Sequence, residues 1–576
     1  MVVGESKIGY ECLLDAMMDW GIRVCCGVTG GGLIHLLKYM DPYVPCHPHS
    51  DQIDFFTIGE YAAGFIPLGH YLATGEIAAA AATTGAATKL LLCGLSDAKL
   101  HNIPAVYLLA ATPSSMAFQS PLQDTTASGS NLVDQVAAEL PQGTFVLDGI
   151  EDLNEQLLAA HHQLKQSKPV AFIMPPDVLS GVASGVSVRD VSPKERYSTD
   201  RSGLAALLQR HLSHKRDGRV VILAGDEAAR HPDMPDLTSR LCTALKAPIV
   251  WSINGANAVS RYNPYAYGYL GFGGNDRATE LWDSLNDRDM LITIGFCGDE
   301  YTVNFGRAKA GLVWNITANA HFYGSSQGSF RHRVEGEFEQ TAGDVGEIIQ
   351  EIILWCQVNP NVCGVDVPFY SNLNLGTPGR MWGDAVDIVA FYEKLDRLWQ
   401  PNSFGFDDVC LAYKDRQYVT QRPHPYAKIY SLYRGSAMGG AYGLGLGAKI
   451  ASPDKHVFIF SGDGCFRLYG GCLMEGRQLG ITLFILDNAD YGIVGQGLSK
   501  ILPQTPSPRY HAGLERIDFG GMARACGWQN FRISSDLSNL SDIMEEAYQQ
   551  DRPSMLVEVP VDTGQIVGPN PRLKNL

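Results

Sequence analysis

The sequence has little positive charge and no pattern that favours nucleic-acid binding. It carries 45 lysines and arginines against 61 acidic residues, which gives a formal net charge of −16. A surface that is negative over most of its area repels a phosphate backbone. We therefore expect no nucleic-acid partner, although an acidic protein can still hold a local basic pocket.

Membrane, secretion and disulfide signals are also lacking. No uncharged apolar run approaches the roughly 18 residues of a membrane helix, and the alanine-rich stretch at residues 77–87 is too short. The first seven residues do not place a basic segment before an apolar one, as a signal peptide does. The 13 cysteines include no C-x-x-C pair, so we expect reduced thiols and neither a zinc site nor a disulfide framework. A cytoplasmic protein without a membrane partner is the expectation.

What the sequence does contain is a repeated alternation of strands and helices. A chain of 576 residues is too long for one hydrophobic core. Alternating apolar strands and helices are typical of α/β domains with mostly parallel sheets. We predict three doubly wound domains, at residues 1–182, 200–356 and 384–576, joined by linkers at 183–199 and 357–383. The strands expected from apolar runs lie at residues 24–28, 77–83, 105–110, 170–174, 219–225, 248–252, 290–295, 312–316, 456–461, 482–487 and 554–559.

The sharpest local motif follows two neighbouring apolar strands of the third domain. Gly462-Asp463-Gly464 comes directly after the strand at 456–461, and Asn488 follows the strand at 482–487. Ligands of open parallel sheets bind beyond the carboxyl ends of the strands. A carboxylate and an amide oxygen suit magnesium, and the glycines allow a diphosphate to approach backbone N–H groups. Two polar turns without a ligand are the alternative.

The stretch GDGCFRLYGGCLMEGRQLGITLFILDN resembles the cofactor motif of thiamine-diphosphate enzymes, in the branch with acetohydroxyacid synthase and pyruvate decarboxylase. The resemblance implies that Asp463, Asn488 and the backbone carbonyl of Asp490 bind magnesium, and that Gly464 and Cys465 face the diphosphate. Asp-Asn replaces the usual Asn-Asn pair, and cysteine replaces the usual serine at 465, so its backbone N–H would make the contact.

A second resemblance lies in the first domain. Gly59-Glu60-Tyr-Ala-Ala-Gly, followed by Ala-Thr-Gly at 73–75, is similar to the segment whose glutamate bonds the aminopyrimidine ring of the coenzyme. A carboxyl group there favours the ring tautomer whose exocyclic nitrogen takes the C2 proton. Such a group works best half-buried, with its pKa raised. A carboxylate that only caps a helix is the alternative for Glu60.

A third resemblance is the glycine-rich stretch at 436–449. In the family a bulky apolar residue wedges between the two coenzyme rings, and Met438 matches that position. The backbone of Ser436 and Met438 is implied to bond the pyrimidine. A dinucleotide-binding loop in an oxidoreductase is the alternative, but no clear apolar strand precedes these glycines.

Three further positions are matched more loosely. Asp408 falls where relatives have an aspartate near the diphosphate, and Gln123 falls near a glutamine that borders the substrate. His101 is expected close to the active-site edge, where it either contacts substrate or caps a turn. The paired histidines of pyruvate decarboxylases are missing from residues 114–123.

The family resemblance implies the function. We expect an enzyme that decarboxylates a 2-oxo acid and transfers the acyl group to a second carbonyl; without the paired histidines, carboligation is favoured over simple decarboxylation. A non-catalytic scaffold is the other alternative, and the retention of Glu60, Asp463 and Asn488 speaks against it. Because these residues lie in different domains, the resemblance implies a site shared between subunits of a homodimer or homotetramer. It leaves FAD open, but no residue set here demands flavin.

Overall fold

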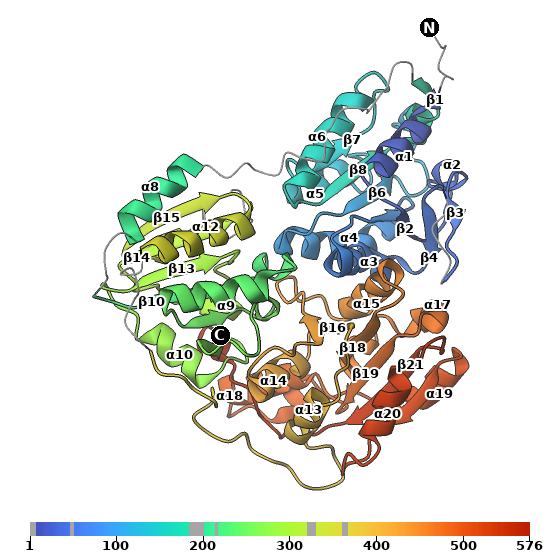
Figure 1. Ribbon diagram of the computed structural model, residues 1–576. Helices are drawn as coiled ribbons and strands as arrows, with labels where there is room; N and C mark the ends of the chain where they lie inside the picture. The colour runs from blue at the N-terminus through green and yellow to red at the C-terminus, as the bar shows by residue number, and fades with distance from the viewer. Residues whose placement is uncertain (1–6, 46–50, 184–200, 213–216, 320–329, 360–366) are drawn as a thin grey trace.

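The computed structural model describes residues 7–45, 51–183, 201–212, 217–319, 330–359 and 367–576. The chain forms three α/β domains, each built around one large parallel sheet (Figure 1). This confirms the predicted α/β fold with mostly parallel sheets. Residues 184–199 of the first predicted linker and 360–366 of the second lie outside the described residues, so the domain boundaries stay predictions.

The first domain has a seven-stranded sheet in the order β3-β4-β2-β5-β6-β8-β7. Helices α1 (Gly9–Asp19) and α6 (Leu153–Lys165) pack on one face, and α3 (Glu60–Thr74) and α4 (Ala86–His101) pack on the other. The central strands are apolar throughout because both faces are covered. The strands are β2 (Val24–Gly27), β3 (Asp41–Pro42), β4 (Asp54–Thr57), β5 (Ala79–Ala82), β6 (Val106–Ala110), β7 (Thr144–Val146) and β8 (Val170–Met174), while β1 (Lys7–Ile8) and β9 (Val182–Ala183) form a separate antiparallel pair.

The central domain has a six-stranded sheet in the order β12-β11-β10-β13-β14-β15, the arrangement of doubly wound dinucleotide-binding folds. Its strands are β10 (Val220–Ala224), β11 (Ile249–Trp251), β12 (Ala266–Tyr269), β13 (Met290–Ile294), β14 (Leu312–Thr317) and β15 (Glu337–Ala342). Its helices are α8 (Arg201–Leu212), α9 (Met234–Leu245), α10 (Asp276–Asp283), α11 (Glu300–Val303) and α12 (Val345–Val358).

The third domain repeats the topology of the first. Its sheet order, β17-β16-β18-β19-β21-β20, matches β4-β2-β5-β6-β8-β7 strand for strand in chain order. The strands are β16 (Ser403–Asp407), β17 (Ala427–Tyr430), β18 (His456–Gly462), β19 (Thr482–Asp487), β20 (Gln529–Arg532) and β21 (Met555–Pro560). The helices include α13 (Ile388–Asp396), α14 (Leu411–Thr420), α15 (Gly440–Ala451), α16 (Asp463–Phe466), α17 (Leu473–Gly476), α18 (Gly492–Ile501), α19 (Phe519–Ala525) and α20 (Leu540–Ala547). Shared topology, which the sequence left open, is thus established.

Helices α3 and α15 occupy equivalent places in these two domains and pack directly on each other. A Cβ at Gly443 would lie 2.4 Å from the carbonyl oxygen of Ala62, and one at Gly447 would lie 2.0 Å from that of Ile66. Only glycine permits so close an approach of two backbones. The glycines of the 436–449 stretch therefore serve this helix contact, which places the start of α3 beside the loop before α15. None of the helices in the described parts of the chain has the length and apolar character needed to cross a bilayer.

Candidate active site

A cavity of about 360 Å³ opens at the carboxyl end of the third sheet, a volume that suits a cofactor. β16 and β18 are neighbours in the sheet, but the chain continues from β16 to β17 on one side and from β18 to β19 on the other. The cavity lies at this topological switch point, where open α/β sheets bind ligands. Its lining includes residues at the carboxyl ends of three neighbouring strands: Val409–Leu411 after β16, Gly462–Cys465 at the end of β18, and Asn488 and Asp490 after β19.

Asp463 and Asn488 meet at this edge because β18 and β19 pair in register, with Gly462 opposite Leu486. Both side chains line the cavity. Asp463 is only 3% exposed, and burial, reinforced by the carboxylate of Asp487, raises its pKa to about 6. Asn488 accepts a hydrogen bond from the backbone N–H of Asp490 at 2.9 Å. The structure thus brings the predicted metal ligands together at one end of the cavity.

The chemistry of this donor set fits a hard divalent cation. The Oδ1 atoms of Asp487 and Asp490 are buried without a hydrogen-bond partner. The charge of Asp487, whose other oxygen is paired with Arg516 at 3.2 Å, raises the pKa of Asp463, and a cation bound at Asp463 would offset that repulsion. Among the described residues no three His, Cys, Asp or Glu side chains form a metal-binding group. The expected magnesium set is of another kind, because it combines a carboxylate with an amide oxygen and a backbone carbonyl.

The turn after β18 also fits a diphosphate. Gly464 lines the cavity, and a Cβ there would lie 2.6 Å from the ring of Tyr491. The thiol of Cys465 is occupied, since it donates to the carbonyl oxygen of Val409 at 3.3 Å, and burial raises its pKa well above the usual value. Because the thiol is bonded within the protein, we expect Cys465 to contact an anion through its backbone N–H.

Ser436 and Met438 line the same cavity from the loop before α15. This loop is held from beneath by Asp408, which is 2% exposed. Its carboxylate accepts the backbone N–H of Gly439 at 2.9 Å and the hydroxyl of Ser461 at 2.7 Å. Burial raises the pKa of Asp408 to about 6. Asp408 is not among the residues that line the cavity, and in this chain it holds the loop through Gly439; its place near the diphosphate stays a prediction.

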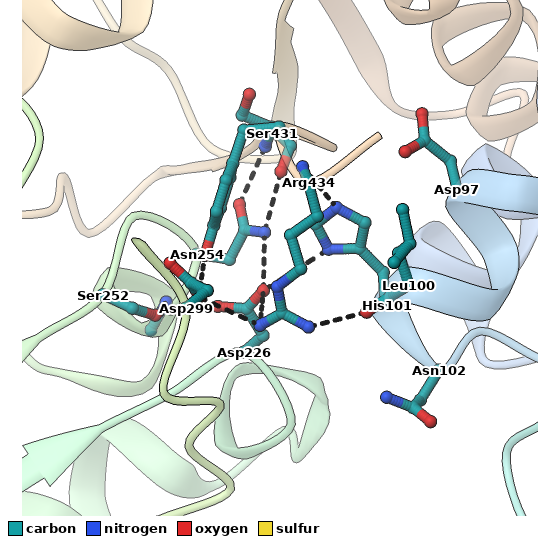
Figure 2. A network of polar contacts seen from close by, with 12 residues as sticks. Asp97, Leu100, His101, Asn102, Asp226, Ser252, Asn254, Asp299, Ser431 and Arg434 are labelled. Carbon is teal, nitrogen blue, oxygen red and sulfur yellow. Dashed lines mark hydrogen bonds and ion pairs between the residues drawn. The ribbon is translucent and has the colours of Figure 1, made fainter. Parts of the chain in front are cut away.

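A buried polar network fixes the other side of this loop (Figure 2). The guanidinium of Arg434 lies 3.3 Å from Asp226 and 3.4 Å from Asp299, two carboxylates of the central domain. It also donates to the backbone carbonyl of Leu100 in the first domain at 2.8 Å. Asp97, at the end of α4, accepts the N–H of Gly435 at 2.8 Å. One arginine of the third domain therefore joins all three domains two residues before Ser436.

His101 belongs to this network. It is 1% exposed, its Nε2 accepts the backbone N–H of Arg434 at 3.2 Å, and its Nδ1 lies 3.5 Å from Asp226. Burial lowers its pKa to about 4, so the ring is neutral at physiological pH. It is not among the residues that line the cavity of Asp463. These buried contacts favour a structural role for His101 over a contact with substrate.

Glu60 and Gln123 lie outside the cavity of their own chain. Glu60 is half-buried at the first position of α3, and the residue before it approaches Cys472, whose Sγ lies 3.0 Å from a Cβ at Gly59. Gln123 is exposed, and its Oε1 accepts the hydroxyl of Thr84 at 2.9 Å. Neither residue is among those that line the cavity.

The sequence did not predict the part of the cavity that the central domain and the C-terminal segment line. The C-terminal residues Asn570 and Arg572 and the central-domain residues Phe272 and Tyr301 line it. Phe272 and Tyr301 stack with their ring centroids 4.4 Å apart. No motif marks these positions, because they reach the site only through the packing of distant segments.

Family models match all three domains. The thiamine pyrophosphate enzyme N-terminal TPP-binding domain matches residues 8–133, the central domain of the same enzymes matches residues 208–321, and the C-terminal TPP-binding domain matches residues 415–559. Together these matches cover most of the chain.

Named relatives agree in length with this chain. It is 22% identical to a probable acetolactate synthase large subunit of Methanocaldococcus jannaschii, over 99% of this chain and 95% of that one. It is also 22% identical to the acetolactate synthase isozyme 3 large subunit of Escherichia coli, over 98% and 96%. Among solved structures, benzoylformate decarboxylase from Polynucleobacter necessarius superposes with a TM-score of 0.74 at 16% identity, over 98% of this chain and 100% of that one. At this identity the superposition speaks for the fold alone.

Proposed function

This chain belongs to the thiamine pyrophosphate enzyme family, and we propose that it uses thiamine diphosphate and magnesium to decarboxylate a 2-oxo acid and to join the remaining acyl group to a second carbonyl compound. The observation that supports this most is the cavity at the switch point of the third sheet. Asp463, Asn488 and Met438 all line that cavity.

Each residue has a distinct part in this proposal. Asp463, Asn488 and the carbonyl of Asp490 would hold the metal, and the backbone of Gly464 and Cys465 would face the diphosphate. Thiamine diphosphate supplies an electron sink for the pair left when a carboxylate is lost as carbon dioxide. The apolar side chains among the lining residues would keep water from the bound coenzyme, which favours the loss of a charged group.

The loop residues and Glu60 would act on the coenzyme rings. Ser436 and Met438 would contact the pyrimidine through their backbone, and the Met438 side chain would hold the two rings at a fixed angle. Glu60 would share a proton with the pyrimidine nitrogen, which prepares the neighbouring amine to take a proton.

A complete site requires a second copy of the chain in this proposal. Within one chain, the residue before Glu60 approaches Cys472, and Glu60 does not line the cavity that holds Asp463. The coenzyme would therefore bind between the first domain of one copy and the third domain of another. A homodimer is the smallest assembly that meets this requirement, and a homotetramer contains the same pair.

Carboligation is favoured over simple decarboxylation because residues 114–123 contain no histidine to deliver a proton to the acyl carbon. The test is to incubate the protein with thiamine diphosphate, magnesium and a panel of 2-oxo acids, alone and in pairs, and to identify products by mass spectrometry. We expect carbon dioxide and a hydroxy ketone or 2-hydroxy-3-oxo acid. Aldehyde alone would select simple decarboxylation, and an unchanged panel would contradict the proposal.

A further inference from the structure

The peptide between Met438 and Gly439 is held at both of its polar groups. The carbonyl oxygen of Met438 accepts a hydrogen bond from the hydroxyl of Tyr61. The N–H of Gly439 donates to the carboxylate of Asp408 at 2.9 Å. Tyr61 belongs to the first domain and Asp408 to the third, so two domains together fix the plane of this one peptide.

Packing aims the hydroxyl of Tyr61 at this peptide. Tyr61 is the second residue of α3, and its half-buried ring lies edge-on to that of Phe65, with the ring centroids 5.3 Å apart. A Cβ at Gly440, the first residue of α15, would lie 2.9 Å from the Phe65 ring. Farther along the two helices, which lie side by side in Figure 1, a Cβ at Gly69 would lie 1.9 Å from the carbonyl oxygen of Leu444. These close contacts leave the helices little room to shift, so Tyr61 and the loop keep their relative places.

The loop before α15 needs such restraint because its backbone is unusual. Ser436 has a φ of +50°, in the left-handed region that residues with a side chain rarely adopt, and Gly439 has a φ of +83°. Conformations of this kind persist only where neighbouring contacts hold them. Met438 lies between these two positions and lines the cavity of Asp463. With its carbonyl bonded to Tyr61, the groups of Met438 left for a ligand are its N–H, which has no acceptor among the described residues, and its side chain.

The residue before Tyr61 has a different place. Glu60 does not line the cavity of its own chain, and in the proposed function it reaches the coenzyme of the other copy. Consecutive residues of an α-helix point about 100° apart around its axis, so the two side chains leave α3 in different directions. In that proposal the start of α3 therefore lies between the site of its own chain and the site of the other copy.

We propose that Tyr61 positions Met438 for the coenzyme that binds in the third domain of its own chain, whereas Glu60 acts on the coenzyme of the other copy; this inference rests on the proposed function. Without the Tyr61 hydroxyl, the carbonyl of Met438 loses its donor, and only Asp408 holds the peptide. The Met438 side chain then holds the coenzyme rings at a less defined angle. Proton transfer from C2 to the amine requires the two groups to be close and aligned, so it slows even though Glu60 is intact.

The first test is Tyr61→Phe, which removes the hydroxyl and keeps the ring that packs on Phe65. We expect exchange of the coenzyme C2 proton, followed by NMR on the loaded protein, to slow about tenfold, the effect of losing a hydrogen bond to a buried carbonyl. Tyr71→Phe, at a half-buried tyrosine of the same helix, is the control and should exchange like the wild type. Urea unfolding checks that both variants are folded. Exchange in Tyr61→Phe within about twofold of the wild type would overturn the inference.

The second test asks which site each residue serves, by placing Tyr61→Phe and Glu60→Gln either in different copies or in the same copy. Copies with different affinity tags are produced together, and mixed dimers are isolated through both tags. In the first dimer one copy carries Glu60→Gln and the other carries Tyr61→Phe, so both changes fall on one site and the second site is intact. In the second dimer one copy carries both changes and the other is wild type, so each site has one change.

In the first dimer we expect about half of the bound coenzyme to exchange its C2 proton at the wild-type rate. In the second dimer none should do so, and the faster half should exchange about tenfold more slowly than the wild type. Equal exchange in the two dimers, or faster exchange in the second, would overturn the inference. A dimer of Glu60→Gln with Asp463→Ala tells the possible failures apart: fast exchange of its bound coenzyme leaves the shared site of the proposed function standing, and slow exchange overturns that site as well.

Discussion

The guanidinium of Arg434 lies 3.3 Å from the carboxylate of Asp226, and this pair connects the central domain to the loop that carries Ser436 and Met438. Both side chains are buried, so the pair is surrounded by little water (Figure 2). A buried charge that loses its partner is costly, because no solvent replaces the lost interaction. The position of the coenzyme loop therefore depends on a contact outside the third domain.

Replacing Arg434 should destabilise the protein and weaken coenzyme binding together. Arg434→Met leaves Asp226 and Asp299 as buried carboxylates without their cation, a loss on the order of 3–5 kcal/mol in unfolding free energy. Urea unfolding and thiamine diphosphate titration measure the two effects. Arg434→Lys, which keeps the charge, should recover part of the coenzyme affinity. Stability lost with coenzyme affinity unchanged would show that the loop does not depend on this arginine.

Asp97 should make the protein less stable as pH rises. Burial raises its pKa to about 8, so the folded state favours the protonated acid that the unfolded chain gives up near pH 4. The contribution is fully present below pH 4 and is lost as pH rises through about 8. Asp97→Asn has no such titration.

Between pH 5 and pH 9 the unfolding free energy of the wild type should therefore fall relative to that of Asp97→Asn. Urea unfolding at one protein concentration measures both. Parallel profiles of the two proteins would show that Asp97 titrates normally.

Asp463→Ala should remove the metal-dependent part of coenzyme binding. With one of the two side-chain ligands gone, we expect the thiamine diphosphate Kd in magnesium to rise at least about tenfold, toward the value that the wild type shows with a chelator. Calorimetric titration with magnesium and with EDTA measures both limits. Asp454→Ala, at an exposed aspartate of the same domain, serves as control. Affinity that is unchanged by the substitution and by the chelator would contradict the magnesium assignment.

Glu60→Gln should preserve the fold and slow exchange of the coenzyme C2 proton. We expect the exchange rate to fall by about 10²-fold or more, the contribution of a positioned acid or base. Hydrogen–deuterium exchange followed by NMR on the loaded protein measures it. The control is Glu475→Gln on α17, an exposed glutamate close to Cys472. If both variants exchange as fast as the wild type, Glu60 has no part in the proton transfer.

Strands that are covered on both faces could be predicted from the sequence, whereas polar strands could not. β19 (Thr482–Asp487) is buried along its whole length and reads as an apolar run. β15 (Glu337–Ala342), at the edge of the central sheet, has only Phe338 and Ala342 as apolar residues among charged and polar ones and gives no such signal. β16 (Ser403–Asp407) was missed although it lies inside its sheet, because serine, glycine and aspartate interrupt its apolar residues.

The residues of the site likewise divide into those that the sequence predicts and those that it does not. Asp463 and Asn488 follow predicted strands, so their neighbourhood could be inferred from strand order alone. Arg572 and Glu300 are 272 residues apart in sequence, and only the packing of the C-terminal segment on the central domain brings them together. The role of His101 was open for a similar reason, since its partners Asp226 and Arg434 come from two other domains.

The most direct measurement of the central claim is complementation between Glu60→Gln and Asp463→Ala. The two variants carry different affinity tags, are produced together, and the mixed dimer is isolated through both tags. If the first domain of one copy and the third domain of the other build each site, one site of the mixed dimer keeps both Glu60 and Asp463, and we expect about half of the wild-type activity per dimer. A mixed dimer no more active than the two parent variants would contradict the shared site.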